Sequence, residues 1–319
     1  MIYLPIMYGL IFMVGLVGNV TALVVYLVKL RPLSSSSIIM VNLTIADLLY
    51  ILTLPFLVHF YYTGQWEFGD FMCRLVRSCF HFNLYGSILL LTVLSVFRYV
   101  VVVYPLKAET VNRPSFAVIC CLAAWLLCVI ITFPVYGLIK ADTGAQQEHS
   151  CIDFASQRNV WVYGWILTVL GFLIPLFAVC LSYSCVARAL SSGGVLPTRS
   201  THLQARRLAV VTLLVFVVCF TPYHVLRQAR MYTAMMSNVS PALEVGVHAA
   251  YIISRPLAAL NTLFDLALVT LAGDRFQQAL RSLLHWNGCL FYRAAPPPRS
   301  FIPSVYRPRG SSGNGLIEN

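Results

Sequence analysis

The sequence predicts an all-α membrane protein, built as a bundle of seven transmembrane helices with a short amphipathic helix after the seventh. Two observations predict this class. The chain is 59% hydrophobic and only 10% charged, whereas soluble domains carry roughly 25% charged residues. Seven mostly apolar stretches of about 20 or more residues, the length that crosses a bilayer, lie at 4–28, 38–61, 71–103, 116–138, 161–186, 208–226 and 245–269.

Each stretch is predicted to be an α-helix, because hydrocarbon offers no outside partner for backbone N–H and C=O groups. Residues 273–280 predict an amphipathic helix on the membrane surface. The Ser-, Gly- and Thr-rich loop 190–204 is expected to be mobile. The helical domain is predicted to span 1–285, and 286–319 to form a disordered tail. Prolines interrupt five of the stretches and predict kinks, although proline is also common in membrane helices: Pro55, Pro134, Pro175, Pro222 and Pro256.

The charge distribution predicts the orientation in the membrane. The formal net charge is +11, and no soluble module carries it, which argues against a nucleic-acid partner. By the positive-inside rule, the basic loops are cytoplasmic, as is the C-terminus, and the N-terminus is extracellular, in a multi-pass plasma-membrane protein. The basic residues of these alternate loops and the tail are Lys29, Arg31, Lys107, Arg113, Arg188, Arg199, Arg206, Arg207, Arg275, Arg281, Arg293, Arg299, Arg307 and Arg309.

Two of the ten cysteines lie outside the interior of the predicted spans, on the side expected to be extracellular. Cys73 begins the third span and Cys151 lies in the loop after the fourth. A disulfide between them is plausible on the oxidising side of the membrane. No metal-ligand cluster, G-x-S-x-G or similar catalytic pattern appears, so no catalytic residue is predicted and an enzyme is disfavoured.

Basic residues inside three spans predict an anion site. Arg77 and His81 are four residues apart and share one face of the third helix. His224 and Arg227 lie near the outer end of the sixth. Arg255 lies about ten residues into the seventh span, roughly 15 Å along a helix, which is too deep for easy snorkelling. An Arg at the centre of a bilayer costs about 2.5–3.5 kcal/mol on insertion scales and is rarely without function.

The ordered motifs of the seven spans resemble the rhodopsin-like G-protein-coupled receptors. The likeness covers all seven spans, and the landmark Trp125, Pro175 and Tyr183 also match. The resemblance implies a disulfide between Cys73 and Cys151. The motifs that carry it are Gly18-Asn19-Val20, Asn42-Leu43-Thr44-Ile45-Ala46-Asp47, Phe97-Arg98-Tyr99 at the D-R-Y position and Cys219-Phe220-Thr221-Pro222 at the C-W-x-P position.

Three departures concern the activation switch of that family. Phe97 replaces the acid of D-R-Y and leaves Arg98 without its adjacent counter-ion. Phe220 replaces the tryptophan. Asp265-Leu266-Ala267-Leu268-Val269 stands where N-P-x-x-Y is expected, so Tyr183 is expected to lack its usual tyrosine partner.

Within the family the likeness is greatest to the nucleotide-receptor branch, and there to receptors for 2-oxoglutarate. It is carried by Phe80-His81-Phe82-Asn83-Leu84-Tyr85, Gln204-Ala205-Arg206-Arg207-Leu208 and the run 254–262. The implied function is a receptor for a small extracellular dicarboxylate, 2-oxoglutarate first. Succinate or nucleotide reception in the same branch is the alternative, and an organic-anion transporter is the rival class.

In the seven-helix arrangement the third, sixth and seventh helices face one cavity. Arg77, His81, Arg227 and Arg255 are then expected to converge with no intramembrane acid beside them, and a dianion would relieve their repulsion. The paired N–H groups of an arginine can bond both oxygens of a carboxylate. Two of these residues have a specific structural alternative: Arg227 snorkels outward, and His81 makes an interhelical hydrogen bond.

Further candidates surround this site. Tyr8 and Tyr61 are expected to add hydroxyl groups, or else to be interfacial aromatics. Asp153 is expected to fold over the site and pair with an arginine. Arg74 and Arg230 are expected to lie at the rim and steer anions. Amine ligands are disfavoured, because receptors for amines carry an Asp where Phe80 stands.

At a deeper polar cluster the resemblance implies an allosteric sodium ion, the one candidate cofactor; a shared proton in a water network is the alternative. Its residues are Asp47, Ser87, Asn261, Thr262 and Asp265, with Asn19 nearby. The predicted activation switch comprises Arg98, Tyr99, Tyr183, Phe220, Pro222 and Asp265. The resemblance implies a heterotrimeric G protein, mainly of the Gq class, as partner, with arrestin as a second candidate.

Overall fold

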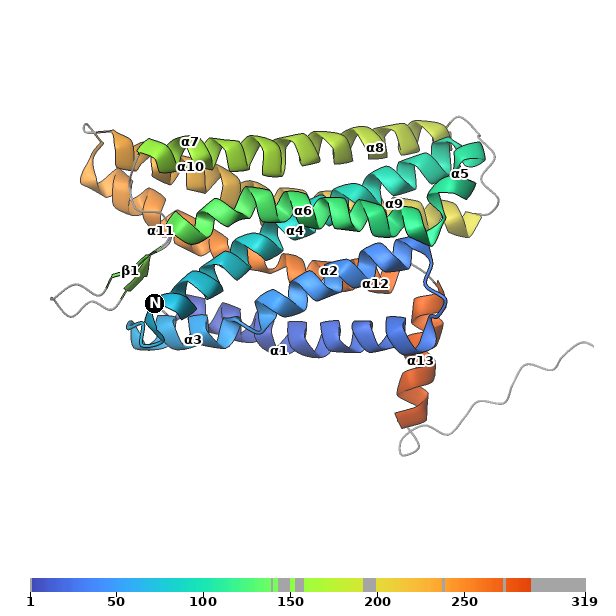
Figure 1. Ribbon diagram of the computed structural model, residues 1–319, viewed down its shortest axis with the longest axis horizontal. Coiled ribbons are helices and arrows are strands. Elements are labelled where there is room, and N and C mark those ends of the chain that lie inside the picture. The colour runs from blue at the N-terminus through green and yellow to red at the C-terminus, as the bar shows by residue number, and fades with distance from the viewer. Residues whose placement is uncertain are drawn as a thin grey trace, which may run out of the picture.

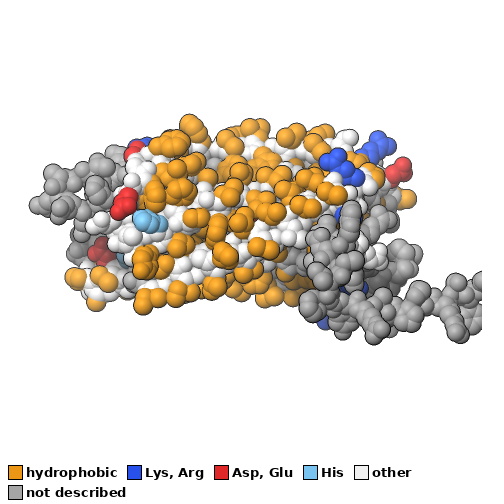
Figure 2. All heavy atoms as spheres, turned by 90° about the horizontal axis from the view of Figure 1, so that it is seen from below, with side chains coloured by type: hydrophobic (Ala, Val, Ile, Leu, Met, Phe, Trp, Pro, Cys, Tyr) orange, Lys and Arg blue, Asp and Glu red, His pale blue; other side chains and the backbone are white. Residues whose placement is uncertain are grey.

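The computed structural model describes residues 2–138, 140–142, 150–152, 158–191, 199–236, 239–271 and 274–287. Within these residues, seven helical spans of 24 to 35 residues are long and apolar enough to cross a membrane. They lie side by side in one bundle (Figure 1). Hydrophobic side chains cover most of the face seen in Figure 2. The predicted seven-helix bundle is therefore confirmed.

The first three spans are formed by α1 (Tyr3–Val24) with η1 (Val25–Lys29), α2 (Ser35–Ile51) with α3 (Leu54–Thr63), and α4 (Gly69–Val103). After the short α5 (Pro105–Val111), the fourth span is α6 (Pro114–Leu138). The fifth comprises α7 (Arg158–Thr168), η2 (Val169–Leu173) and α8 (Ile174–Ser191). The sixth comprises α9 (Arg199–Leu214), η3 (Val215–Phe220) and α10 (Thr221–Met235), and the seventh α11 (Pro241–Ala259) and α12 (Asn261–Leu271).

The third span, α4, lies at the centre of the bundle and packs against α2, α6 and α8. Every residue from 83 to 91 in it is buried. A helix that is apolar all round its circumference is buried on all sides, and the polar side chains in this stretch are only Asn83, Tyr85 and Ser87. Side chains on α4 therefore reach several neighbouring spans at once.

The fifth and sixth spans each contain a wide π-type turn just before a proline. η2 ends two residues before Pro175, and η3 ends two residues before Pro222. At the end of η3, the N–H of Thr221 donates to the carbonyl of Phe216, five residues back. Proline has no N–H and its ring displaces the carbonyl four residues earlier, so the preceding turn widens. The sequence predicted kinks at these two prolines, and the structure has a wide turn before each of them.

The first and seventh spans approach each other closely through a glycine. A Cβ added to Gly18 would lie 2.3 Å from Cδ1 of Leu266, a distance that no real side chain tolerates. Small residues let membrane helices pack tightly where the hydrophobic effect does not drive them together. Gly18 thus makes room for the leucine that stands in place of the family's proline.

A disulfide and a β-hairpin mark one end of the bundle, called the disulfide end below. Cys73, in the first turns of α4, is bonded to Cys151, as predicted. Cys151 lies on β2 (Ser150–Ile152), which pairs antiparallel with β1 (Lys140–Asp142). The hairpin was not predicted, because strands of three residues are too short to show an alternating pattern.

The opposite end, called the tail end, carries α5 and α13 (Asp274–Asn287) (Figure 1). α13 is the predicted amphipathic helix, and it continues beyond residue 280 to Asn287. The buried ring of Phe276 packs on Tyr26, with centroids 5.2 Å apart. In the loop expected to be mobile, residues 199–204 are helical and begin α9. The tail from 288 onward lies outside the described residues, so its predicted disorder stays a prediction.

Candidate functional site

Three buried arginines lie in the half of the bundle nearest the disulfide. Arg77 on α4 is 4% exposed, Arg227 on α10 is 1% exposed and Arg255 on α11 is 6% exposed. Burying an isolated charge is costly unless other groups solvate it. The positions of these three guanidinium groups and their partners therefore define the candidate site.

Arg77 lies on the face of α4 that points toward the disulfide. Its Nη2 donates to the carbonyl oxygen of Cys151 at 3.1 Å. The disulfide joins that same cysteine to Cys73, one turn before Arg77. The hairpin is thus fixed to α4 twice, once covalently and once through the guanidinium group.

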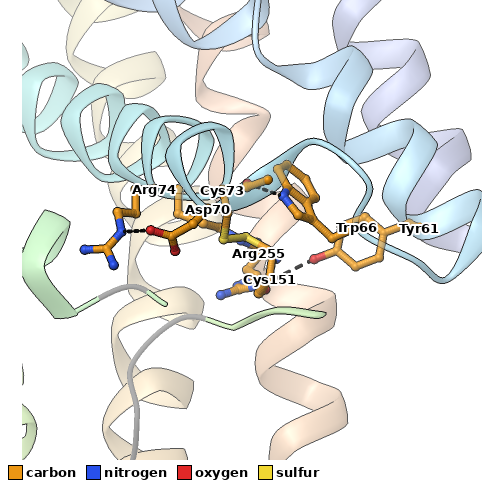
Figure 3. The surroundings of a disulfide bond; sticks show 9 residues. Tyr61, Trp66, Asp70, Cys73, Arg74, Cys151 and Arg255 are labelled. Carbon is orange, nitrogen blue, oxygen red and sulfur yellow. Dashed lines mark hydrogen bonds and ion pairs between the residues drawn. A yellow bond between two sulfur atoms is a disulfide. The ribbon is translucent and has the colours of Figure 1, made fainter. Parts of the chain in front are cut away.

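Arg255 lies among tyrosine hydroxyl groups. Its Nη1 contacts the hydroxyl of Tyr61 at 3.5 Å (Figure 3). Its Nη2 contacts the hydroxyl of Tyr251 at 3.4 Å. The Tyr61 hydroxyl also interacts with the guanidinium group of Arg77. A phenolic oxygen can accept more than one N–H, so Tyr61 links the arginines of α4 and α11.

Tyr8 supports this link from the first span. Its ring stacks on Tyr61 with centroids 5.7 Å apart and planes 12° apart. Tyr8 is only 1% exposed. It is therefore an interior residue, not one of the interfacial aromatics given as the alternative.

His81 lies between the arginine positions and makes the interhelical hydrogen bond that was the alternative for it. Its Nδ1 donates to the carbonyl of Arg77 at 2.9 Å, since a carbonyl can only accept. Its Nε2 lies 3.3 Å from the hydroxyl of Tyr223 on α10. This contact joins the third and sixth spans, and a ligand contact by His81 stays a prediction.

Arg227 points into the bundle, so the snorkelling alternative is wrong for it. Its Nη1 donates to the hydroxyl of Tyr85 on α4 at 2.5 Å. Its Nη2 donates to Oγ1 of Thr168 at 2.8 Å and to the carbonyl of Gly164 at 3.2 Å, both on α7. His224, one turn earlier on α10, contacts the same Nη2 at 3.4 Å.

His224 is held by aromatic packing. Its ring stacks on Phe172 with centroids 4.3 Å apart and planes 9° apart. Phe172 belongs to the wide turn η2. This contact ties the sixth span to the irregular part of the fifth.

The two predicted rim arginines are less buried. Nε of Arg74 forms an ion pair with Asp70 at 2.6 Å (Figure 3). The guanidinium of Arg230 lies 4.9 Å from the ring centre of Tyr251. Asp153, predicted to cover the site, lies outside the described residues.

Several partners of the arginines were not predicted from the sequence: Tyr85, Thr168, Tyr223 and Tyr251. The sequence held a signal for two of them, Tyr251 and Tyr223. Tyr251 precedes Arg255 by four residues, and Tyr223 precedes Arg227 by four, so each pair shares a helix face. The rings lie 5.0 and 5.5 Å from the respective guanidinium groups.

A second polar cluster lies deeper in the bundle. Asp47, Ser87, Asn261 and Asp265 are at most 1% exposed. Asn83, which was not predicted, donates to Oδ1 of Asp47 at 3.0 Å. Within the described part of the chain, several oxygens of this cluster have no hydrogen-bond partner: Asp47 Oδ2, Ser87 Oγ, Asn261 Oδ1 and both carboxylate oxygens of Asp265.

These oxygens fit a hard cation. Carboxylate, amide and hydroxyl oxygens are the ligands that such ions prefer. Two carboxylates so close repel each other unless a cation or a proton lies between them. The chemistry of the cluster thus agrees with the expected sodium ion, whose binding stays a prediction.

Of the predicted switch residues, Tyr99 and Tyr183 lie toward the tail end, and Phe220 and Pro222 lie midway along the sixth span. Tyr183 donates to Oγ1 of Thr212 at 3.2 Å, which joins the fifth and sixth spans. Tyr99 donates to the hydroxyl of Tyr104 at 3.3 Å. Phe220 is fully buried at the end of η3, two residues before Pro222 in the first turn of α10. Phe220 packs edge-on against Phe216, with centroids 5.4 Å apart.

Residues 18–265 match the model of the 7 transmembrane receptor (rhodopsin family). The chain is 43% identical over 285 residues to 2-oxoglutarate receptor 1 of Rattus norvegicus, covering 88% of this chain and 83% of that protein. It is 35% identical to succinate receptor 1 of the same species, covering 88% and 90%. It is 36% identical to a purinoceptor of Homo sapiens, covering 87% and 76%.

Proposed function

The chain belongs to the rhodopsin family of seven-transmembrane receptors, and on this premise we propose that it is a cell-surface receptor for a small dicarboxylate. The observation that carries the proposal is the set of three buried arginines, Arg77, Arg227 and Arg255, on three different spans near the disulfide end. Guanidinium groups recognise carboxylates through paired N–H donors. Several such groups around one site favour a ligand with more than one negative charge.

The proposed ligand is 2-oxoglutarate. Relatives named for 2-oxoglutarate have higher identity than the relative named for succinate. The tyrosine hydroxyls of Tyr61 and Tyr251 supply donors beside Arg255, and these suit an oxygen in addition to the carboxylates. Succinate lacks such an oxygen.

The mechanism is a shift between two conformations of the receptor. A ligand moves this equilibrium only by binding one conformation better than the other. A dianion that contacts α4, α10 and α11 together favours the conformation in which these helices close around it. The wide turn η3 and Pro222 lie between Arg227 and the tail end of the sixth span, so that region is where the span would bend.

The proposed orientation has the disulfide end outside the cell and the tail end in the cytoplasm. A disulfide is stable on the oxidising side, and Lys and Arg side chains gather at the tail end (Figure 2). The cytoplasmic partner is a heterotrimeric G protein of the Gq class, with arrestin as a second partner. Arg98 and the basic loops supply the contact surface.

Sodium is the proposed allosteric ion of the deep cluster. Asp47, Ser87, Asn261 and Asp265 would hold it through their oxygens, and its charge would offset that of the two carboxylates. A ligand-induced rearrangement of the seventh span would alter this set, because α12 carries Asn261 and Asp265.

The test is a panel of dicarboxylates and nucleotides applied to cells that express the chain, read by intracellular calcium. The expected result is a response to 2-oxoglutarate that Arg77→Ala and Arg255→Ala abolish while surface expression persists. Uptake of labelled dicarboxylate is measured in the same cells. Uptake without a calcium response, or a response only to neutral or cationic compounds, would refute the proposal.

A further inference from the structure

The arginine of the sixth span is already engaged by the fifth and third spans. Nη2 of Arg227 donates to Thr168 Oγ1 at 2.8 Å and to the Gly164 carbonyl at 3.2 Å. Nη2 also contacts Nδ1 of His224, on its own helix, at 3.4 Å. Nη1 donates to the hydroxyl of Tyr85 at 2.5 Å. Among the described residues, Nε of Arg227 has no hydrogen-bond partner. All the hydrogen-bond partners described for this guanidinium are neutral groups.

The shape of a guanidinium decides what a ligand must displace. A carboxylate can take two parallel N–H bonds from the Nε/Nη2 edge or from the Nη1/Nη2 edge. Both edges use Nη2, whose N–H groups point to Thr168 and Gly164 in the structure. A paired contact to Arg227 therefore requires Nη2 to leave at least one acceptor on α7.

The acceptors on α7 remain satisfied when Arg227 leaves them. Nε2 of Gln228 donates to Thr168 Oγ1 at 2.5 Å and to the Gly164 carbonyl at 2.8 Å. Losing a buried hydrogen bond is costly mainly when it leaves a polar group without a partner. The amide of Gln228 would still donate to both acceptors after Arg227 has left them. Arg227 can therefore leave Thr168 and Gly164 at little cost.

The packing leaves room for these contacts at two glycines of the fifth span. A Cβ on Gly171 would lie 2.5 Å from Cε1 of the Tyr85 ring, and a Cβ on Gly164 would lie 2.6 Å from Sδ of Met231. Tyr85 therefore reaches Arg227 across a glycine in the wide turn η2. Larger residues at these positions would push the third and sixth spans away from the fifth.

We propose that Thr168, Gly164 and Tyr85 form a latch that holds Arg227, and that a ligand carboxylate opens it by taking their place. The inference rests on the proposed dicarboxylate function. Opening the latch releases α10 from α7 at a point five residues beyond Pro222. Ligand binding is thereby coupled to movement of the sixth span, and Thr168 and Tyr85 are positioning residues that act through Arg227.

Thr168→Val removes the hydroxyl acceptor at nearly constant volume, and Thr168→Ser retains it. The expected result for Thr168→Val is higher signalling without ligand and a lower EC50 for the dicarboxylate, on the order of tenfold for one hydrogen bond to a charged group. Thr168→Ser is expected to match the wild type. A merely structural threonine would instead weaken the response when replaced.

Thr132→Val is the matched control, since Thr132 is also buried and bonds only the carbonyl of Cys128 on its own helix among the described residues. It is expected to leave both readouts unchanged. Tyr85→Phe removes the acceptor of Nη1 and is expected to shift both readouts as Thr168→Val does. If Thr168→Val does not reach the cell surface, Tyr85→Phe provides the test of the latch.

A well-expressed Thr168→Val or Tyr85→Phe with unchanged basal signalling and EC50 overturns the latch, as does a Thr168→Ser that behaves like the valine variant. In both cases the wild type still responds to dicarboxylate, and the proposed function stands. A wild type that responds to no dicarboxylate refutes the proposed function itself.

Discussion

Replacing Arg255 with glutamine tests the buried charge of the seventh span. Glutamine keeps a polar side chain able to contact the hydroxyls of Tyr61 and Tyr251, but it removes the positive charge and the paired parallel N–H donors of the guanidinium group. The existing contacts to these hydroxyls are long, at 3.5 and 3.4 Å. We therefore expect them to rearrange easily around a carboxylate in the wild-type receptor.

The expected effect follows from the lost hydrogen bonds. A hydrogen bond to a charged group contributes about 1.5–3 kcal/mol, so two of them contribute about 3–6 kcal/mol. At about 1.4 kcal/mol for each tenfold change in affinity, this corresponds to roughly 100- to 10,000-fold. The glutamine amide recovers about 1 kcal/mol as a neutral hydrogen bond, which leaves about 2–5 kcal/mol, so the expected increase in EC50 is roughly 30- to 4,000-fold.

The assay is a calcium dose–response curve for 2-oxoglutarate, normalised to surface expression of a tagged chain. Arg230→Gln is the matched control, because Arg230 lies over the same Tyr251 ring but is less buried. It is expected to change the EC50 by less than about threefold, as a charge that only steers the ligand. An Arg255→Gln receptor with an EC50 within threefold of the wild type would refute the reasoning.

Three further variants test separate parts of the structure. Tyr61→Phe removes the hydroxyl shared by two arginines, and the EC50 is expected to rise about three- to tenfold; the exposed Tyr62→Phe serves as control, and equal effects would exclude a specific role. Gly171→Ala is expected to lower the melting temperature of the purified receptor, because overpacking costs about 1–3 kcal/mol. Gly137→Ala, whose Cβ would meet nothing within 4 Å, is expected to leave that temperature unchanged; an equally stable Gly171→Ala would contradict the packing argument. Asp265→Asn is expected to abolish the change in agonist affinity when sodium is replaced by a large organic cation, and a retained sodium effect would exclude this aspartate as a ligand of the ion.

The spans and the intramembrane arginines could be predicted from the sequence because each depends on local information. An apolar run long enough to cross a bilayer forms a helix whatever its neighbours are. The depth of Arg255 in its span follows from counting residues. The pairing of Cys73 with Cys151 came from the family resemblance, and the structure confirms it.

The hydrogen-bond partners of Arg227 could not be predicted from the sequence, because they depend on how the helices are rotated against one another. Tyr85 and Thr168 are 142 and 59 residues away in sequence. The wide turn η2 and the glycine within it set which face of the fifth span meets the third, and no local pattern predicts that turn. Snorkelling was wrong for Arg227 for the same reason, since the acceptors that solvate it come from other spans.

The departures from family motifs have different physical consequences. Leu266, in place of proline, packs against Gly18. Tyr183 bonds Thr212 on the neighbouring span, so its hydroxyl has a partner without a tyrosine at position 269. Phe220, in place of tryptophan, is fully buried and packs on an aromatic ring. Each substitution is accommodated by packing that the sequence pattern did not reveal.

Equilibrium binding to the purified receptor tests most directly whether two negative charges are recognised. Labelled 2-oxoglutarate is displaced by unlabelled 2-oxoglutarate and, separately, by an analogue of equal length in which one carboxylate is an amide. We predict that the mono-amide binds at least about 100-fold more weakly, as expected when an arginine loses a paired carboxylate. Equal affinities for the diacid and the mono-amide would contradict a site built from arginines on separate spans.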